Sequence, residues 1–158
     1  MKERRSSRQN AFSLLELVIV IAIIAILAAI AIPRMSRGSK GAGDSALAAN
    51  LAVLRNAIDI FAAEHTGTFP SVADIVNQMT QYTNEAGTPQ AAKDPNHTYG
   101  PYVRKIPPLP VGTKKGSIGI ALVDDVGVGW IYDPDTGAIN ANCLDSAKDD
   151  AGKQYNQY

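Results

Sequence analysis

One carboxylate lies inside an otherwise apolar stretch near the N-terminus of this 158-residue chain. Between Phe12 and Ile32 the polar side chains are those of Ser13 and Glu16 alone. A carboxylate in such surroundings is costly unless it meets a specific partner, so Glu16 suggests a function. The chemistry open to it is ion pairing. The stretch is preceded by four basic residues: Lys2, Arg4, Arg5 and Arg8.

The remaining residues with reactive or metal-binding side chains form no recognisable catalytic or metal-binding motif. The two histidines, His65 and His97, lack ligand spacing, and the sequence has no nucleophile motif or phosphate-binding loop. One cysteine, Cys143, excludes an internal disulfide and is expected to be a small, partly buried side chain. Because the formal net charge is zero, a basic surface for nucleic acid is not indicated. We therefore expect neither an enzyme nor a nucleic-acid binder.

The apolar stretch is long enough to cross a membrane. A helix over residues 12–32 would measure about 31 Å, close to the hydrocarbon thickness of a bilayer. Its residues are apolar all round, which indicates lipid or burial on every side. The basic residues before it predict a cytoplasmic N-terminus. A secretory signal peptide has a shorter apolar region with a small-residue cleavage site, whereas a plain signal anchor remains an alternative that gives Glu16 no role.

The start of the stretch resembles the processing motif of type IV prepilins and of the pseudopilins of type II secretion. The residues that carry the resemblance are Asn10-Ala11-Phe12-Ser13-Leu14-Leu15-Glu16-Leu17-Val18-Ile19-Val20. In that family a short charged leader ends in a small residue, usually glycine, where this chain has Ala11. The resemblance implies that residues 1–11 are a leader and that prepilin peptidase cuts between Ala11 and Phe12. It also implies N-methylation of Phe12.

Cleavage would leave Phe12 with a free ammonium group, four residues before Glu16. In a bundle of such helices, the ammonium of one subunit could meet the carboxylate of a neighbour staggered by about one turn. Because an unpaired charge would be expensive there, this pairing would set the axial register. A contact between Phe12 and Glu16 within one chain is the alternative, since their spacing is i, i+4. Phe12 and Glu16 are therefore the candidate assembly residues.

The sequence predicts a break after the apolar helix. Pro33 removes a backbone donor and glycines follow it, so we expect the helix to be interrupted over residues 33–43. A globular domain over residues 44–144 would then begin with a second helix, with Asp44 or Ser45 as its N-cap and Gly67 at its C-terminal end. Five apolar residues recur on one face of this helix at steps of three and four: Leu47, Leu51, Leu54, Ile58 and Phe61.

The rest of the chain predicts a small sheet. A short helix over residues 72–82 and a proline-rich loop lead to three strands, at residues 117–123, 128–132 and 138–142, which form an antiparallel meander. The helix stripe is expected to be covered by residues of this sheet, namely Ile118, Ile120, Trp130 or their neighbours. The polar residues 145–158 predict a frayed tail.

These elements predict an α+β, pilin-like fold. A long N-terminal helix, membrane-spanning in its first half and amphipathic in its second, would pack on the small antiparallel meander. The major pseudopilins of type II secretion bind calcium in an acidic loop, but the loop pattern around Asp124, Asp125, Asp133 and Asp135 does not match theirs. Turn formation explains these aspartates, so no metal or other cofactor is expected.

The resemblance implies a structural filament subunit, a pseudopilin of a type II secretion pseudopilus. The hairpin Trp130-Ile131-Tyr132-Asp133, without a cysteine-closed C-terminal loop, favours it over a subunit of a type IV pilus used in adhesion, motility or DNA uptake. A membrane-anchored periplasmic binding domain that never polymerises is the third hypothesis. The implied protein is a single-pass inner-membrane protein with a periplasmic domain. Its implied partners are further copies of itself, prepilin peptidase and other assembly components.

Overall fold

The computed structural model describes residues 13–158, including all their side chains except those of residues 30–39. The chain divides into two compact units, Met1–Ser39 and Lys40–Tyr158, and each is described by itself. The fold is the predicted α+β type, with a long N-terminal helix that has an apolar stretch and small sheets in the second unit.

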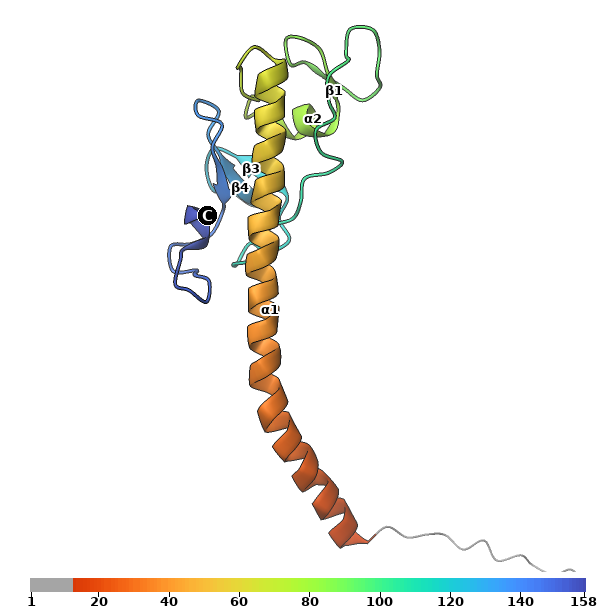
Figure 1. The fold of residues 1–158 in the computed structure, drawn as a ribbon, viewed down its shortest axis with the longest axis vertical. Coiled ribbons are helices and arrows are strands. Elements are labelled where there is room, and N and C mark those ends of the chain that lie inside the picture. Colours follow the sequence, from red (N-terminus) through yellow and green to blue (C-terminus); the bar gives the residue numbers. More distant parts are fainter. Residues whose placement is uncertain (1–12) are drawn as a thin grey trace, which may run out of the picture. The chain divides into compact units, whose positions relative to one another are not determined.

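Helix α1 extends from Leu14 to Glu64 (Figure 1). The predicted break over residues 33–43 is therefore wrong, because this segment has helical backbone. Proline removes one backbone donor and crowds the preceding turn, which weakens a helix without necessarily ending it. Ser45, expected as an N-cap, instead donates a hydrogen bond from Oγ to the Gly41 carbonyl oxygen, 3.0 Å away within the helix.

The C-terminal end of α1 follows the prediction. The Gly67 backbone N–H donates to the Ala62 carbonyl oxygen at 2.8 Å, and Gly67 has a φ of 84°. Glycine adopts this left-handed conformation without the steric cost of a Cβ atom, so it can close the last turn. The next helix, α2, is short and covers Ile75–Thr80.

The predicted stripe on α1 is buried in the core of the second unit. Leu47, Leu51, Leu54, Ile58 and Phe61 are all at most 2% exposed. They share one hydrophobic cluster with Ile120 and Trp130, as expected. Ile118 does not cover the stripe, because it is 56% exposed. Strand β3 begins only at Gly119, so the alternation that places Ile120 inward does not extend to Ile118.

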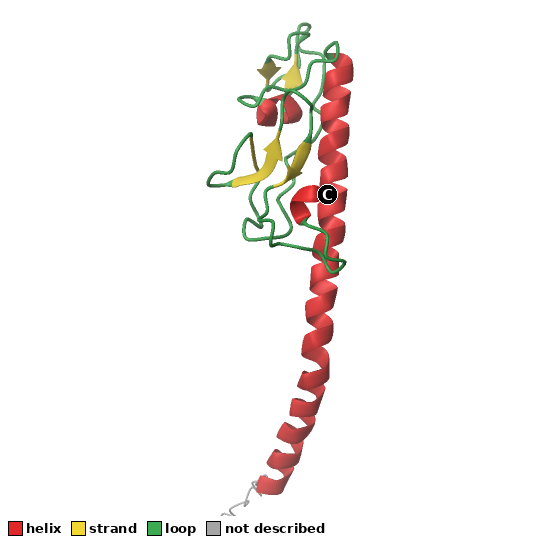
Figure 2. Ribbon diagram, turned by 90° about the vertical axis from the view of Figure 1, so that its left-hand side faces the viewer, coloured by secondary structure: helices red, strands yellow, loops and turns green. Residues whose placement is uncertain are grey.

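The main sheet has the strand order β3-β4-β5, and Figure 2 draws the strands as yellow arrows. Strand β3 covers Gly119–Ala121, β4 covers Val128–Tyr132 and β5 covers Ile139–Ala141. Strands β4 and β5 are antiparallel, with Trp130 opposite Ala141, but β3 and β4 are parallel, with Ile120 opposite Trp130. The predicted antiparallel meander is thus wrong for β3.

A six-residue connection suffices for this parallel pair because the strands are so short. Parallel neighbours usually need a crossover of a dozen or more residues. Strand β3 has three residues, however, and spans only about 10 Å. Residues 122–127 can extend up to about 20 Å, so they can carry the chain back to the start of β3.

Two very short strands lie in the region expected to be a loop. Strand β1 covers Tyr82–Thr83 and pairs antiparallel with β2, Pro89–Gln90. Two-residue strands leave almost no alternation in a sequence, which explains why the pattern did not predict them. Thr83 is fully buried, and its backbone also pairs with Tyr99.

The C-terminal segment packs on the domain, so the predicted frayed tail is wrong. Tyr155 is only 4% exposed and begins the 3-10 helix η1, Tyr155–Gln157. Its hydroxyl donates to an Asp44 carboxylate oxygen of α1 at 2.7 Å. Arg55 Nη2 donates to the carbonyl oxygens of Ile139 and Tyr158. Buried aromatic surface anchors a segment whose remaining residues are mostly polar.

Candidate assembly site

The first described turn of α1 holds the candidate residue Glu16. Ser13 precedes the helix, and its carbonyl oxygen accepts the Leu17 N–H at 3.2 Å. Glu16 lies in the first turn, where the helix dipole favours a carboxylate. The other candidates at this end, Ala11 and Phe12, lie outside the described residues. The structure therefore does not test the proposed pairing of Phe12 with Glu16.

Ser13 and Glu16 also have the spacing of a capping box, which the sequence analysis missed. In this motif a serine N-cap is followed three residues later by a glutamate that bonds back to the cap. The serine carbonyl accepts the first helical hydrogen bond, as an N-cap residue does. The pattern S-x-x-E at residues 13–16 could have revealed it. Glu16 could thus act by capping its own helix. Experiments on Glu16 therefore need a control at Ser13.

Beyond the first turn, the N-terminal part of α1 presents apolar side chains to its surroundings. Leu14–Ala29 is an apolar helical segment. Its large side chains are 45–80% exposed, for example Leu14 at 80% and Ile26 at 64%. A helix that is apolar on all sides is stable only in lipid or when surrounded by other protein. The segment can therefore contact a membrane, a bundle of like helices, or each in turn.

A second part of α1 also satisfies the length and hydropathy of a membrane span. Lys40–Glu64 has a mean hydropathy of 1.4, but 39% of its most apolar window is buried inside the protein. This part carries the core stripe with Leu47 and Leu51, and Arg55 holds the C-terminal segment. We assign it to the globular domain, because a helix packed on a soluble core passes the same test. The segment suited to a membrane is the exposed one, Leu14–Ala29.

Two of the four aspartates considered for calcium, Asp124 and Asp133, accept hydrogen bonds from protein donors. The Asp124 carboxylate accepts hydrogen bonds from Lys114 Nζ and from Asn142 Nδ2, the latter at 2.7 Å. The Asp133 carboxylate accepts hydrogen bonds from the Thr136 hydroxyl and from the Asp135 backbone N–H, and these lower the pKa of Asp133. Among residues 13–158, no group of three or more histidine, cysteine or acidic side chains is arranged to hold a metal ion.

The ammonium group of Lys114 lies beside Asp124, in the place that a metal ion could otherwise fill. Its ammonium pairs with Asp124 and donates to the Asp125 carbonyl oxygen at 3.0 Å. Asn142 bridges Asp124 and the Val128 carbonyl oxygen, 2.8 Å away. The ammonium thus ties the turn that carries Lys114 to the connection between β3 and β4.

Replacing Lys114 with methionine should lower the free energy of unfolding by at most about 1 kcal/mol, because the Asp124 carboxylate, which is 62% exposed, loses its charged partner. The neighbouring exposed Lys115→Met should change it by less than about 0.5 kcal/mol. Urea unfolding with and without a calcium chelator measures both effects. If calcium raises the urea midpoint of the wild type, the loop binds a metal ion, and the assignment of Lys114 as the cation that pairs with Asp124 is contradicted.

The histidines and the cysteine have structural surroundings. His65 is 3% exposed, stacks on Phe61 at 3.9 Å between ring centroids, and has Nδ1 2.8 Å from the Phe61 carbonyl oxygen. His97 bonds to Asp94 and thereby holds the pKa of that carboxyl far below its usual range. Cys143 is half-buried, as expected, and burial raises the pKa of its thiol.

Residues 6–32 match the prokaryotic N-terminal methylation motif. This motif indicates a type IV pilin-like protein that is processed by prepilin peptidase and assembles into pilus-like polymers. It marks a class of structural proteins rather than enzymes. Together with the apolar helix, it indicates membrane anchoring. Neither a curated protein nor a solved structure matches the chain.

Proposed function

We propose that this protein is a pseudopilin, a filament subunit of a type II secretion pseudopilus that serves protein secretion. The observation that carries the proposal is the methylation motif on an exposed apolar helix that continues into a domain with its own core. The helix Leu14–Ala29 can be held in the inner membrane and then packed into a filament, since both environments cover apolar side chains. The globular domain would face the periplasm, because the basic residues 2–8 keep the N-terminus cytoplasmic.

Assembly would depend on the two charges at the start of the mature chain. The ammonium of Phe12 in one subunit would pair with Glu16 of its neighbour, and the pair would fix the register between helices. Glu16 lies in the first turn of the exposed apolar segment, a position from which a neighbour can be reached. The other proposed partners are prepilin peptidase, which would cut between Ala11 and Phe12, and the remaining components of the secretion machinery.

A subunit of a type IV pilus is the second candidate. The way in which the C-terminal segment is fastened favours the pseudopilin. Here Tyr155 and Tyr158 bond to Asp44 and Arg55 of α1, and the single cysteine, Cys143, forms no disulfide. Electron microscopy of sheared filaments, in strains that lack either the secretion system or the pilus machinery, separates the two candidates. Filaments that need only the pilus machinery would overturn the pseudopilin assignment.

Processing gives a direct test of the N-terminal sites. The intact mass of protein extracted from membranes should show the loss of residues 1–11 and the gain of one methyl group. In a strain without prepilin peptidase, the same protein should retain its leader and lack the methyl group. A mature chain that begins anywhere other than Phe12 would contradict the proposed site.

A further inference from the structure

The surface beside the start of β3 combines an open apolar groove with a basic rim. The groove has a volume of about 440 Å³. It is lined by Val76, Ile106, Pro108, Ile118, Arg104 and Lys105. Ile118 is 56% exposed and Val76 39%, so both side chains can be reached by another molecule. Apolar walls with a few polar groups at their edge are typical of a binding site.

The loop that follows β3 adjoins this groove. Strand β3 is only three residues long, and the Gly119 N–H donates to the Gly127 carbonyl oxygen at 2.9 Å. This bond brings the far end of the loop back to the start of the strand, next to Ile118. The exposed aliphatic side chains of the loop are Leu122 (54%), Val123 (67%) and Val126 (96%). Groove and loop, here called the β3 surface, thus form one exposed apolar region, which marks a contact with another molecule.

Both parts of the β3 surface are held in place before anything binds. On the groove side, Trp130 Nε1 donates to the Pro107 carbonyl oxygen at 2.9 Å. On the loop side, the Asp124 carboxylate accepts hydrogen bonds from Lys114 and Asn142. A preformed surface loses little conformational entropy on binding, which favours association.

The two edges of the sheet differ in how they are covered. Strands β3 and β5 are the edge strands. The 3-10 helix η1 lies beside β5, and Arg55 Nη2 donates to the Ile139 carbonyl oxygen at 3.1 Å. Strand β3 is instead flanked by the exposed side chains of Ile118 and Leu122. An edge strand flanked in this way is a place at which another chain can pack.

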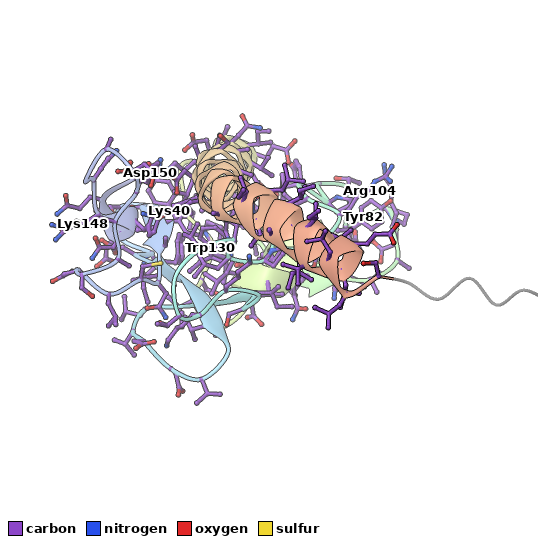
Figure 3. All side chains as sticks on the ribbon, turned by 90° about the horizontal axis from the view of Figure 1, so that it is seen from below. Lys40, Tyr82, Arg104, Trp130, Lys148 and Asp150 are labelled. Atoms are coloured by element: carbon purple, nitrogen blue, oxygen red, sulfur yellow. The ribbon has the colours of Figure 1, made fainter. Side chains whose placement is uncertain are left out.

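The charges of the β3 surface indicate what that chain carries. Arg104 and Lys105 are exposed, and the side chain of Arg104 projects from the edge of the domain in Figure 3. Within residues 13–158 neither of them has an ion-pair partner. The Asp125 carboxylate lies in the loop, where it accepts the Val126 N–H at 2.7 Å, so carboxylates of a partner belong at the Arg104 end. A second copy that used the same surface would bring its own basic rim to the contact, which disfavours it.

We propose that the β3 surface binds an acidic amphipathic segment of a different protein. Aliphatic side chains of the segment enter the groove, and its carboxylates pair with Arg104 and Lys105. Val123 and Val126 extend the contact beyond the groove. The inference rests on the proposed function in that the domain must be exposed in the periplasm. The contact is not one between subunits, so filament formation does not depend on it.

Site-specific photo-cross-linking of the full chain in its own membranes tests this contact. Benzoylphenylalanine in place of Ile118 should give a discrete product on illumination, and mass spectrometry should find in it a peptide of another protein with acidic and aliphatic residues. The same probe in place of Val53, which is 50% exposed on α1, is the control and should not give this product. Arg104→Glu with Lys105→Glu should lower its yield about tenfold, whereas Arg104→Lys should retain most of it. These changes are on the surface, so the unfolding midpoint should stay close to that of the parent.

A charge exchange with the identified partner completes the test. Changing the acidic residues of the cross-linked peptide to lysine should restore the yield with the Arg104→Glu, Lys105→Glu subunit. A product that contains only this chain, a yield indifferent to the charge changes, or no product would each overturn the contact. Filaments that form without the product leave the proposed function standing. A charge-sensitive product from a chain that never forms filaments supports the contact and counts against the function.

Discussion

Replacing Glu16 with leucine should abolish filaments while the subunit remains in the membrane. The change makes the apolar segment more apolar, so insertion should persist or improve. The folded domain should be unaffected, because Glu16 belongs to the other compact unit. What disappears is the attraction that would dock an incoming subunit in register. Glu16→Asp should give an intermediate yield, since the shorter side chain reaches less far.

Ser13→Ala is the matched control for this experiment. If Glu16 acts mainly by capping α1, removing the serine of the capping box should impair assembly as well, since caps contribute about 1 kcal/mol to a helix. If Glu16 pairs with a neighbour, Ser13→Ala should assemble at close to wild-type yield. The yields are measured by comparing membrane fractions with sheared filaments. Normal filaments from Glu16→Leu would show that the register is set elsewhere.

The second large effect is expected in the core. Leu54 is 1% exposed on the inner face of α1, so Leu54→Ala should lower the free energy of unfolding by about 2–5 kcal/mol. The neighbouring Val53 is 50% exposed, and Val53→Ala should change it by less than about 0.5 kcal/mol. Valine has a lower helix propensity than leucine, but this contributes only a few tenths of a kcal/mol to the difference, roughly 0.5 kcal/mol at most.

Trp130 provides the measurement. It is the only tryptophan in the sequence, it is fully buried, and its Nε1 donates to the Pro107 carbonyl oxygen at 2.9 Å. Its fluorescence should therefore report urea unfolding of the globular domain in the detergent-solubilised full chain. If the Leu54→Ala midpoint equals that of Val53→Ala, the helix does not pack on the sheet as described.

The sequence predicted those features that depend on a regular spacing of residues. The stripe from Leu47 to Phe61 repeats over four turns, and a buried helix face requires such a repeat. The strand predicted at residues 128–132 coincides with β4, because five residues are enough to show an alternating pattern. The end of α1 at Gly67 was predicted because glycine is free to adopt a positive φ.

Features set by tertiary contacts were not predictable in this way. The parallel pairing of β3 depends on where a six-residue loop returns, and both pairings are compatible with the same alternation. The C-terminal segment looked polar because its main buried anchor is one aromatic residue, Tyr155, whose partner Asp44 lies 111 residues earlier, while Tyr158 is bound through its backbone carbonyl to Arg55. Helical structure across Pro33 likewise shows that a local preference for a break can be overridden. At the candidate site, Glu16 was singled out because it is a charged residue in an apolar segment. Its capping-box spacing from Ser13 was overlooked.

The distance along the chain between Asp44 and Tyr155 also has a consequence for biogenesis. The apolar stripe on α1 is made early, but its partners Ile120, Trp130 and Tyr155 are made last. At a synthesis rate of ~5–20 residues per second, the 111 residues between Asp44 and Tyr155 take roughly 6 to 22 seconds. Until residues 119–141 have been made, the stripe has no sheet to cover it. The proposed export would therefore have to keep the stripe from Leu47 to Phe61 shielded until the last strand and Tyr155 have been made.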